Sequence, residues 1–318
     1  KELIKNRKII KGLSVLFVYI ISKLMKDISI YYKYILSNVD TLNEEYDIAI
    51  AYAGPMDFIS YFVINKIKSK KRVQWIHFDI SKIGFNVNFA KKIYDKFDKV
   101  FVVSNEGKDK LINFLPSLKD KTEVFFNIIS CKMIEKMSYE GEGFSDDFDG
   151  IRLLTVGRLT EQKSYPTAIR AMKKIKEKHK NVRWYVLGEG PERKRLEHLI
   201  DSLGLQEDFI LSGSVENPYP YYKSADIYVH ATGFEGKSIA IQEAQTLGLP
   251  IIASESNREQ IENGVDGILC RLEPEAVSEA VCRMMEDEKL RNRYREASLK
   301  KNVVYEKDME LLTGLLFR

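Results

Sequence analysis

Short runs rich in Val, Ile and aromatic residues alternate with stretches of helical periodicity from Ile48 to the end of the chain. In the first half these runs are "YDIAIAYA", "RVQWIHFD", "KVFVVS" and "EVFFNII". Helical patterns separate them at 57–67, around 90–97 and from Glu106. Such alternation is typical of a parallel sheet with helices on both faces. The pattern therefore predicts an α/β fold.

A second alternation follows a polar, glycine-bearing stretch, "SYEGEGFSDDFDG", at 138–150. Its six strand-like runs are "IRLLTVGRL", "VRWYVLGEG", "FILSGSV", "DIYVHA", "PIIAS" and "GILC". We interpret 138–150 as a linker, with Asp146 and Asp147 in a solvated acidic turn. A chain of 318 residues is long enough for two cores. We expect two doubly wound parallel-sheet domains, Rossmann-like, at 1–145 and 151–318.

Composition excludes several classes of protein. Hydrophobic residues make up 44% of the chain and charged residues 30%, which is typical of a soluble globular protein. The three cysteines have no CxxC spacing, so neither a disulfide framework nor a zinc site is indicated. The apolar run 13–21 is shorter than the roughly 20 residues that a membrane-spanning helix needs. We expect a cytoplasmic protein.

Basic residues are concentrated near the start of the chain. Residues 1–40 contain eight Lys or Arg and three acidic residues, whereas the whole chain has a net charge of +4. One interpretation is attraction of this segment, with its aromatic side chains, to an anionic membrane surface at the inner face of the plasma membrane. The alternative is a solvated helix face over an ordinary core.

Two strands of the second half end in residues suited to binding a diphosphate. Ligands of open parallel sheets bind at the carboxyl ends of the strands. One strand ends in Gly157 and Arg158, with Lys163 at the start of the next helix. Another precedes a helix whose N–H groups at Ser238 and Ile239 add further donors. Two fixed cations beside a helix N-terminus predict an anion site.

Two glutamates flank that helix N-terminus. Glu235 precedes the helix, and Glu243 lies about 7–8 Å along its axis at about 1.5 Å per residue. A carboxylate accepts two hydroxyl hydrogen bonds, which matches a ribose diol at one end and a sugar ring at the other. The pair therefore indicates a nucleotide-sugar laid across the helix end.

Four segments carry a family resemblance. In order, they are "TVGRLTEQKS", "VLGEGPERKRLE", "FILSGSVENPYPYYKSADIYV" and "FEGKSIAIQEAQTLGLPIIAS". They resemble the successive signatures of the retaining GT-B glycosyltransferases of glycosyltransferase family 4, in particular the bacterial polysaccharide and lipopolysaccharide branch. The resemblance covers almost all of 151–270 and implies two Rossmann-like domains facing each other across a cleft.

The resemblance also implies roles for individual residues. Arg158 and Lys163 match the cations that grip the donor diphosphate in that family. Glu235 matches the residue that contacts the donor sugar, and Glu243 the one that contacts the ribose. Main-chain groups near Val215 would meet the nucleobase, and the donor site would also include Gly157 and Lys237. The chain departs from the family at Ser164, where glycine often follows the lysine.

The first half resembles the acceptor domain of the family from about Asp47 onward. His77, in "QWIHFD", matches the strand-end histidine that lies near the donor sugar and the incoming hydroxyl. We expect this domain to be incomplete, because the first strand and its glycine-rich loop are not found in the sequence. The last helix is expected to pack back on it.

The function expected is retaining transfer of a hexose-type sugar from a nucleotide-diphosphate donor, preferably a UDP-sugar, to a saccharide or lipid-linked saccharide. No metal, separate cofactor or nucleic acid is expected; "LGEGP" lacks the third glycine of a nicotinamide site. One alternative is a sucrose- or trehalose-synthase-like enzyme with a soluble acceptor. Another is a non-catalytic nucleotide-sugar-binding fragment.

Overall fold

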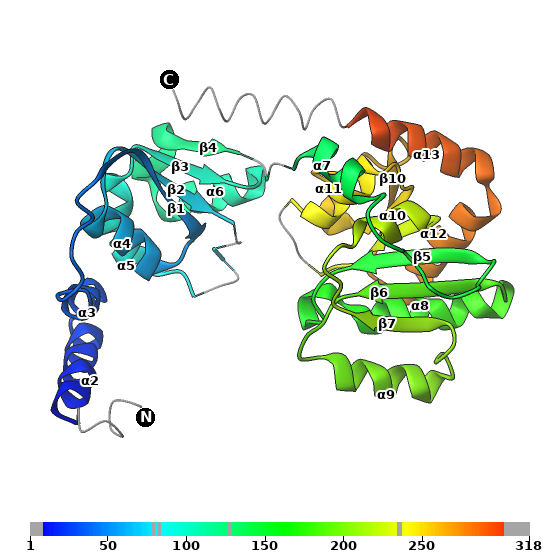
Figure 1. Ribbon diagram of the computed structural model, residues 1–318, viewed down its shortest axis with the longest axis horizontal. Coiled ribbons are helices and arrows are strands. Elements are labelled where there is room, and N and C mark those ends of the chain that lie inside the picture. Colours follow the sequence, from blue (N-terminus) through cyan, green and yellow to red (C-terminus); the bar gives the residue numbers. More distant parts are fainter. Residues whose placement is uncertain are drawn as a thin grey trace. The chain divides into compact units, whose positions relative to one another are not determined.

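The protein is described by a computed structural model covering residues 9–77, 80–81, 84–125, 127, 129–233 and 237–301. It divides into two compact units, Lys1–Phe126 and Asn127–Arg318. Each unit contains one parallel sheet, as Figure 1 shows. The predicted α/β fold with two parallel-sheet domains is therefore confirmed.

The first unit has a four-stranded sheet in the order β1-β2-β3-β4. The strands are β1 (Glu45–Gly54), β2 (Lys68–Ile76), β3 (Lys99–Val102) and β4 (Thr122–Val124). Its helices are α2 (Ile9–Leu24), α3 (Ser29–Ile35), α4 (Asp57–Lys66), α5 (Val87–Ile93), α6 (Asn105–Phe114) and the 3₁₀ turns η1 (Tyr94–Lys96) and η2 (Pro116–Lys121). Buried side chains of β1 to β3 pack with α4, α5 and α6 in one core.

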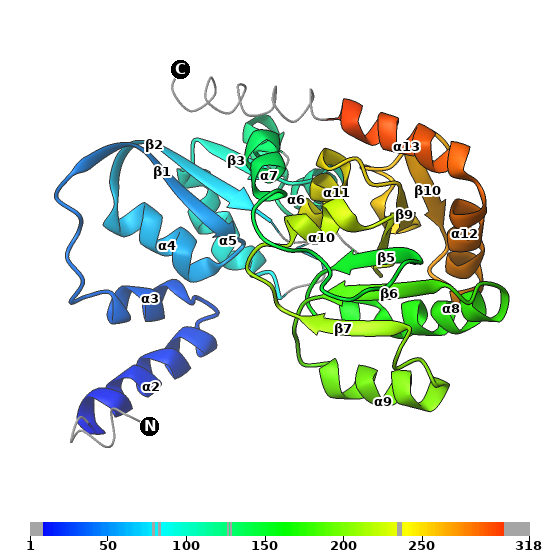
Figure 2. The ribbon, with the colours of Figure 1, turned by 45° about the vertical axis from the view of Figure 1, so that its right-hand side comes forward.

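The second unit has a six-stranded parallel sheet in the order β10-β9-β8-β5-β6-β7. The strands are β5 (Ile151–Val156), β6 (Val182–Leu187), β7 (Phe209–Gly213), β8 (Ile227–His230), β9 (Ile251–Ser254) and β10 (Gly267–Cys270). The chain starts in the middle, adds strands to one edge, and then returns to extend the other, so the order reverses between β5 and β8. This is the order of a Rossmann sheet, and Figure 2 shows β5, β6 and β7 side by side.

Helices cover both faces of this sheet. They are α7 (Cys131–Met137), α8 (Tyr165–Lys178), α9 (Arg193–Leu203), α10 (Tyr219–Ser224), α11 (Ile239–Thr246), α12 (Pro274–Glu286), α13 (Glu288–Lys300) and the turns η3 (Glu161–Lys163) and η4 (Glu255–Asn257). Alternate residues of β5 point to opposite faces: Leu153 packs with α8, α9 and α12, and Leu154 packs with α10 and α11. Between β9 and β10 the described chain has no α-helix and contains only the short turn η4.

The boundary between the units precedes the expected linker. Ile129, Cys131 and Ile134 pack against Tyr219 and Leu247, which ties the segment before 138–150 to the second unit. The side-chain amide of Asn217 donates to the carbonyl oxygens of Met137 and Glu140, both at 2.8 Å. The expected domain limits of 1–145 and 151–318 therefore differ from the division that the structure shows, because α7 and the chain after it are anchored on the second unit.

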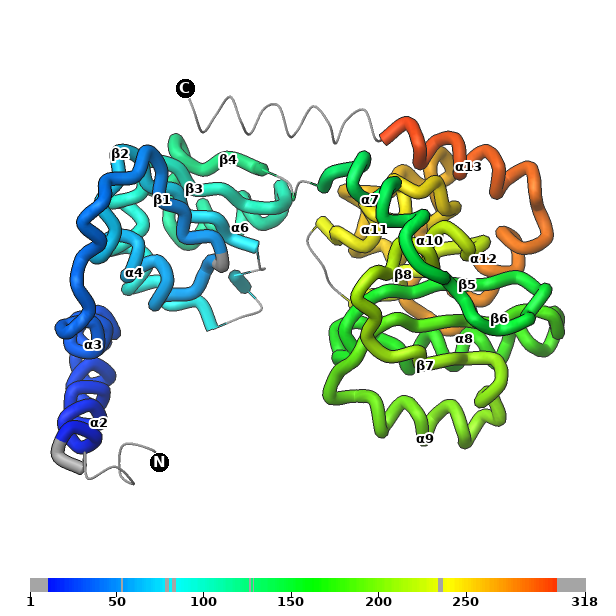
Figure 3. Tube along the Cα trace, in the orientation of Figure 1, coloured from blue at the N-terminus to red at the C-terminus, as the bar shows by residue number. Residues whose placement is uncertain are grey.

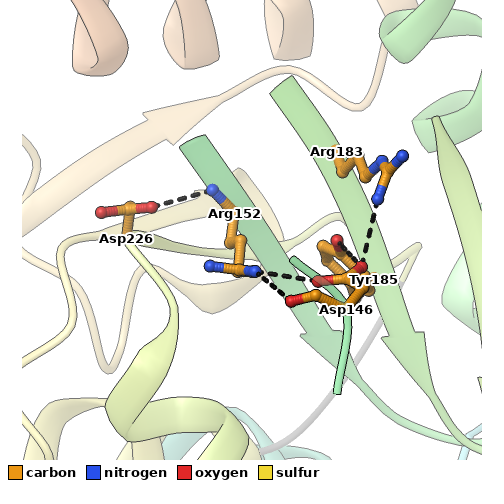
Figure 4. A network of polar contacts seen from close by, with 5 residues as sticks. All are labelled: Asp146, Arg152, Arg183, Tyr185 and Asp226. Carbon is orange, nitrogen blue, oxygen red and sulfur yellow. Dashed lines mark hydrogen bonds and ion pairs between the residues drawn. The ribbon is translucent and has the colours of Figure 1, made fainter. Parts of the chain in front are cut away.

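Asp146 does not lie in a solvated turn, contrary to the prediction. Its Oδ1 lies 2.8 Å from Nη2 of Arg152, and its Oδ2 accepts a 2.6 Å hydrogen bond from the hydroxyl of Tyr185. Arg183 adds a contact of 3.2 Å to Oδ2. Figure 4 shows these side chains together, with Asp226 accepting from the backbone N–H of Arg152 at 2.8 Å. The segment around Asp146 is thus bound by side chains of both β5 and β6.

Helix α2 leaves much of its apolar surface open to solvent. Figures 2 and 3 show it as the helix before α3, extending away from the sheet of its own unit. The exposed fractions of Leu13, Leu16, Phe17, Ile20 and Leu24 range from 47% to 78%. This arrangement does not match a solvated polar face over an ordinary core. In the described residues no helix is long and apolar enough to cross a membrane.

Candidate functional site

A cavity of about 380 Å³ lies at the carboxyl ends of β5, β6 and β7. Its walls are Val156, Gly157, Arg158, Leu187, Gly188, Glu189, Ser214, Val215 and Pro218. A volume of this order falls within the usual range for small-molecule sites. The cavity brings together three residues predicted for the donor site, namely Gly157, Arg158 and Val215.

Glycines allow the ends of β5 and β6 to approach closely at this cavity. The N–H of Gly157 donates to the carbonyl oxygen of Leu187 at 3.0 Å, and that of Gly188 donates to Gly213 at 2.7 Å. Gly188 has φ +152°, and a Cβ atom there would lie 2.0 Å from the carbonyl oxygen of Gly157. A side chain at Gly188 would therefore force the two strand ends apart.

Arg158 and Lys163 supply positive charge beside the cavity. Arg158 is exposed at the end of β5, and no salt bridge to it is found in the part of the chain that the structure describes. Lys163 ends η3, and its stem lies against Gly157: a Cβ atom on that glycine would be 3.3 Å from Cε of Lys163. The two cations therefore border the same strand end, as predicted from their positions in the sequence.

Ser164 has a backbone conformation that glycine adopts more easily than serine. It adopts a left-handed backbone with φ +46° and ψ +35°, immediately before helix α8. Glycine adopts this conformation without the steric cost that other residues meet. The turn is held by Tyr165, whose hydroxyl donates to the carbonyl oxygen of Gly157 at 2.8 Å. The serine therefore keeps the turn that places Lys163 beside Gly157.

The loop after β8 joins the loop that carries Lys163. The N–H of Gly233 donates to the carbonyl oxygen of Gln162 at 2.9 Å. Thr232 is buried, and its backbone is hydrogen-bonded to the side chain of Ser254. The hydroxyl of Ser254 accepts from the N–H of Thr232 at 3.1 Å and donates to the carbonyl oxygen of Thr232 at 2.7 Å. Glu235 lies outside the described residues.

The start of α11 differs in part from the expectation. The N–H of Ser238, expected to face a phosphate, donates to the side-chain oxygen of Gln260, whose amide donates back to the carbonyl oxygen of Ser238 at 2.9 Å. Ser238 is 3% exposed. Ile239 follows with an exposed side chain, and the carbonyl oxygen of Lys237 accepts from Asn127 at 3.5 Å. The N–H of Ser238 is thus already engaged by the side chain of Gln260.

Glu243 is held by two tyrosines of α10. The hydroxyl of Tyr219 donates to Oε1 at 3.1 Å, and that of Tyr222 donates to Oε2 at 3.0 Å. Burial raises the pKa of Glu243. The hydrogen bonds from Tyr222 and Tyr219 lower it, but by less, so the net shift is upward. Burial and the neighbouring carboxylate also raise the pKa of Tyr219. Both hydroxyls therefore remain protonated donors at neutral pH.

His77 lies at the carboxyl end of β2 in the first unit. Its backbone N–H donates to the carbonyl oxygen of Gly54 at 3.0 Å. Its ring stacks on Trp75, with centroids 5.7 Å apart and planes at 12°, and contacts Tyr52 at 4.4 Å. The strand-end position expected for this residue is therefore present within its own unit.

Several residues at the site are not among those predicted from the sequence. Gly188 and Glu189 follow β6, and Ser214 follows β7, so the strand-end rule could have found all three. Glu189 lies 3.2 Å from Arg193. Tyr219 and Tyr222 carry only a weak signal, since tyrosines three apart in a short helix are common in cores.

Comparison with known proteins supports this picture. The family model described as Glycosyl transferases group 1 matches residues 147–301. An uncharacterized glycosyltransferase of Methanocaldococcus jannaschii is 31% identical over 52% of this chain and 42% of its own. The N-acetylgalactosamine-N,N'-diacetylbacillosaminyl-diphospho-undecaprenol 4-alpha-N-acetylgalactosaminyltransferase of Campylobacter jejuni is 28% identical over 64% of this chain and 55% of its own. The chain thus spans about half the length of these curated relatives.

Solved structures show the same fold. Anabaena HepE, in complex with UDP and glucose, superposes with a TM-score of 0.72 at 18% identity, covering 85% of this chain and 77% of that one. A variant of S. aureus TarM, in complex with Fondaparinux, alpha-GlcNAc-glycerol and UDP, gives 0.69 at 16% identity, covering 91% and 59%. The chain has the GT-B fold of these proteins, and its residues 147–301 match the family model described as Glycosyl transferases group 1.

Proposed function

We propose that the protein transfers a hexose-type sugar from a nucleotide-diphosphate donor to a hydroxyl of a saccharide or lipid-linked saccharide, in the synthesis of a cell-surface polysaccharide. The observation that carries this proposal is the cavity at the ends of β5 to β7, bordered by the cations Arg158 and Lys163. A partly apolar cavity beside fixed positive charge suits a nucleoside joined to a diphosphate.

The donor would lie with its base in the cavity near Val215 and its diphosphate toward Arg158 and Lys163. Glu243, on the helix that follows β8, would accept hydrogen bonds from the ribose hydroxyls. The family resemblance assigns Glu235 to the transferred sugar. His77, from the acceptor-side domain, would position the incoming hydroxyl.

In the proposed reaction, the two cations stabilise the leaving group. The bond between the anomeric carbon and the β-phosphate oxygen breaks, and negative charge grows on that phosphate. Arg158 and Lys163 would neutralise this charge at the moment it develops. The acceptor oxygen bonds to the anomeric carbon on the same face, and its proton passes to the departing phosphate, so the configuration is retained. Because both cations are protein side chains, we propose that no divalent metal is needed.

The relatives support the choice of donor and acceptor. HepE and TarM were each crystallised with UDP, which favours a UDP-sugar here. The Campylobacter relative is named for an undecaprenol-linked acceptor, and an O-antigen biosynthesis glycosyltransferase of Escherichia coli is 28% identical over half of this chain. These names support a lipid-linked saccharide as the acceptor.

The exposed apolar side chains of α2, next to Lys11, Lys23 and Lys26, support attachment to an anionic membrane surface on the cytoplasmic side. Vesicles of phosphatidylglycerol should bind the protein at low salt, and vesicles of phosphatidylcholine should not. Replacing Phe17 and Leu24 with Ser should abolish binding; equal binding to both vesicle types would contradict this part of the proposal.

The experiment that tests the function is a thermal-shift panel of UDP-, GDP- and ADP-sugars, followed by turnover of the best donor in excess EDTA. One donor should raise the melting temperature and be turned over with a saccharide or lipid-linked acceptor. A shift without turnover would favour a nucleotide-sugar-binding role, and turnover only with a soluble sugar acceptor would favour a sucrose- or trehalose-synthase-like enzyme. No shift with any donor would contradict the proposal.

A further inference from the structure

Helix α10 connects the cavity to Glu243. Pro218 lines the cavity, and α10 begins at the next residue. Tyr219 and Tyr222 are three residues apart, so their side chains lie on the same side of this helix. Each hydroxyl reaches a different oxygen of Glu243, at 3.1 and 3.0 Å. The carboxylate is therefore held at both oxygens by one element.

These two hydrogen bonds leave room for a ligand. An ionised carboxylate offers about four lone-pair positions. Two of them accept from Tyr219 and Tyr222, and two remain, which is the number that a ribose 2′,3′-diol needs. Because the tyrosine hydroxyls take one position on each oxygen, they also fix the plane of the carboxylate. Both tyrosines donate to a charged acceptor, which strengthens each bond relative to a neutral one.

Burial and ring packing fix the position of Tyr222. Its side chain is fully buried, and its ring lies 5.4 Å from that of Tyr228. The hydroxyl of Tyr228 donates to the carbonyl oxygen of Val156 at 3.4 Å and lies 3.1 Å from Nδ1 of His230. Val156 is part of the cavity wall. A row of packed aromatic side chains therefore leads from the end of β5 to the carboxylate of Glu243.

We infer that Tyr219 and Tyr222 are positioning residues, which orient the carboxylate of Glu243 toward the ribose diol of a nucleotide bound in the cavity. This inference rests on the proposed function, which assigns the ribose to Glu243. It extends the site to two residues whose hydroxyls contact Glu243. Their effect on affinity is exerted through Glu243 and is therefore specific to ligands that carry the diol.

The test is a comparison of ligands with and without the diol. Calorimetry gives the Kd of UDP, GDP and ADP and of their 2′,3′-dideoxy forms, and the tightest pair is carried forward. The wild-type protein should prefer the ribose form. Tyr219→Phe and Tyr222→Phe should each reduce this preference about five- to tenfold, which is the size of effect that one typical intramolecular hydrogen bond has. Glu243→Gln should remove most of it.

A matched control lies in the same helix. The ring of Tyr221 packs on that of Phe144, with centroids 5.1 Å apart, and the hydroxyls that donate to Glu243 are those of Tyr219 and Tyr222, so Tyr221→Phe should leave the preference unchanged. In the Glu243→Gln background, Tyr222→Phe should have no further effect on it. Circular dichroism and melting temperature check that each variant is folded.

The outcomes separate the inference from the function on which it rests. If the tyrosine variants weaken the ribose and dideoxy ligands equally, their role is structural and the inference is overturned. If the wild-type protein binds both forms alike, the ribose contact of Glu243 is wrong, and the inference falls with it. If no nucleotide binds, the proposed function itself fails.

Discussion

A Cβ atom placed on Gly188 would lie 2.0 Å from the carbonyl oxygen of Gly157, closer than any packed side chain comes to a backbone atom. The two glycines follow neighbouring strands, and both line the cavity. Their close approach sets the wall between the ends of β5 and β6. The cavity therefore depends on a backbone contact that side chains cannot adjust.

Gly188→Ala should consequently destabilise the protein by about 3 kcal/mol or more, since backbone must move to relieve the clash. Gly204→Ala is the matched control: it also has a positive φ, of +65°, but nothing lies within 4 Å of its Cβ position. The control should cost only the strain of a left-handed residue, about 1–2 kcal/mol. Urea unfolding of the two variants measures the difference, and equal losses would contradict the clash.

Asp146→Asn should also lower stability, with a dependence on pH. Burial disfavours the charged form of Asp146, but the hydrogen bond from Tyr185 and the Arg152 guanidinium outweigh it, and the pKa of the carboxyl is lowered. The folded-state pKa thus lies below the unfolded value, so the stabilisation is present above that unfolded value, about 3.9, and is lost as the pH falls below it. The variant should lose about 1–2 kcal/mol at pH 7 and less at pH 3, where the wild-type carboxyl is closer to being protonated.

The exposed neighbour Asp147 provides the control for this prediction. Asp147→Asn should leave the free energy of unfolding within about 0.5 kcal/mol of wild type at both pH values. A solvated turn, as the sequence predicted, would make the two variants alike.

Asp57→Asn should have the opposite effect on stability. Burial raises the pKa of Asp57 to about 6, against a weaker effect of the Asn86 side chain. The folded protein therefore holds this proton to higher pH than the unfolded chain, and the free energy of unfolding falls as the pH rises from about 4 to about 6. Asparagine cannot ionise, so the variant should melt at a higher temperature than wild type at pH 7. The control is Asp109→Asn, on the exposed face of α6, which should leave the melting temperature unchanged. A lower melting temperature for Asp57→Asn than for wild type would refute the argument.

Lys163→Ala should weaken binding of a nucleoside diphosphate far more than binding of the nucleoside. Its ammonium group is proposed to contact only the phosphates, so its removal should raise the Kd of the diphosphate about 10- to 100-fold and leave that of the nucleoside within about twofold. The control is Lys174→Ala, a half-buried lysine of α8 that pairs with Glu275 at 3.0 Å. Calorimetry measures both ligands, and an equal loss for diphosphate and nucleoside would place Lys163 elsewhere.

The positions of residues at strand ends predicted the site best. Gly157, Arg158 and Val215 border one cavity because parallel strands end at the same edge, and alternating strands and helices are visible in the chain itself. The six strands of the second sheet were predicted for the same reason.

Contacts between distant segments could not be predicted in this way. Asp146 is hydrogen-bonded to Arg152 and Tyr185, which lie 6 and 39 positions further along the chain. Nothing in "SDDFD" indicates which of its carboxylates makes these contacts. Ser238 was expected to offer a free N–H, but Gln260, 22 positions on, takes it. The hydrogen bond from Tyr222 to Glu243 likewise depends on how α10 packs against α11. Local patterns place residues on elements, whereas packing decides which side chains meet.

The central claim is that one cavity in the second unit receives the nucleoside of a nucleotide-sugar, with its diphosphate beside two cations. A crystal structure of the protein with the nucleoside diphosphate that binds most tightly tests this directly. The base should occupy the cavity between Gly188 and Val215, with the phosphates at Arg158 and Lys163 and the ribose diol on Glu243. A nucleotide bound anywhere else, with this cavity filled only by water, would contradict the account.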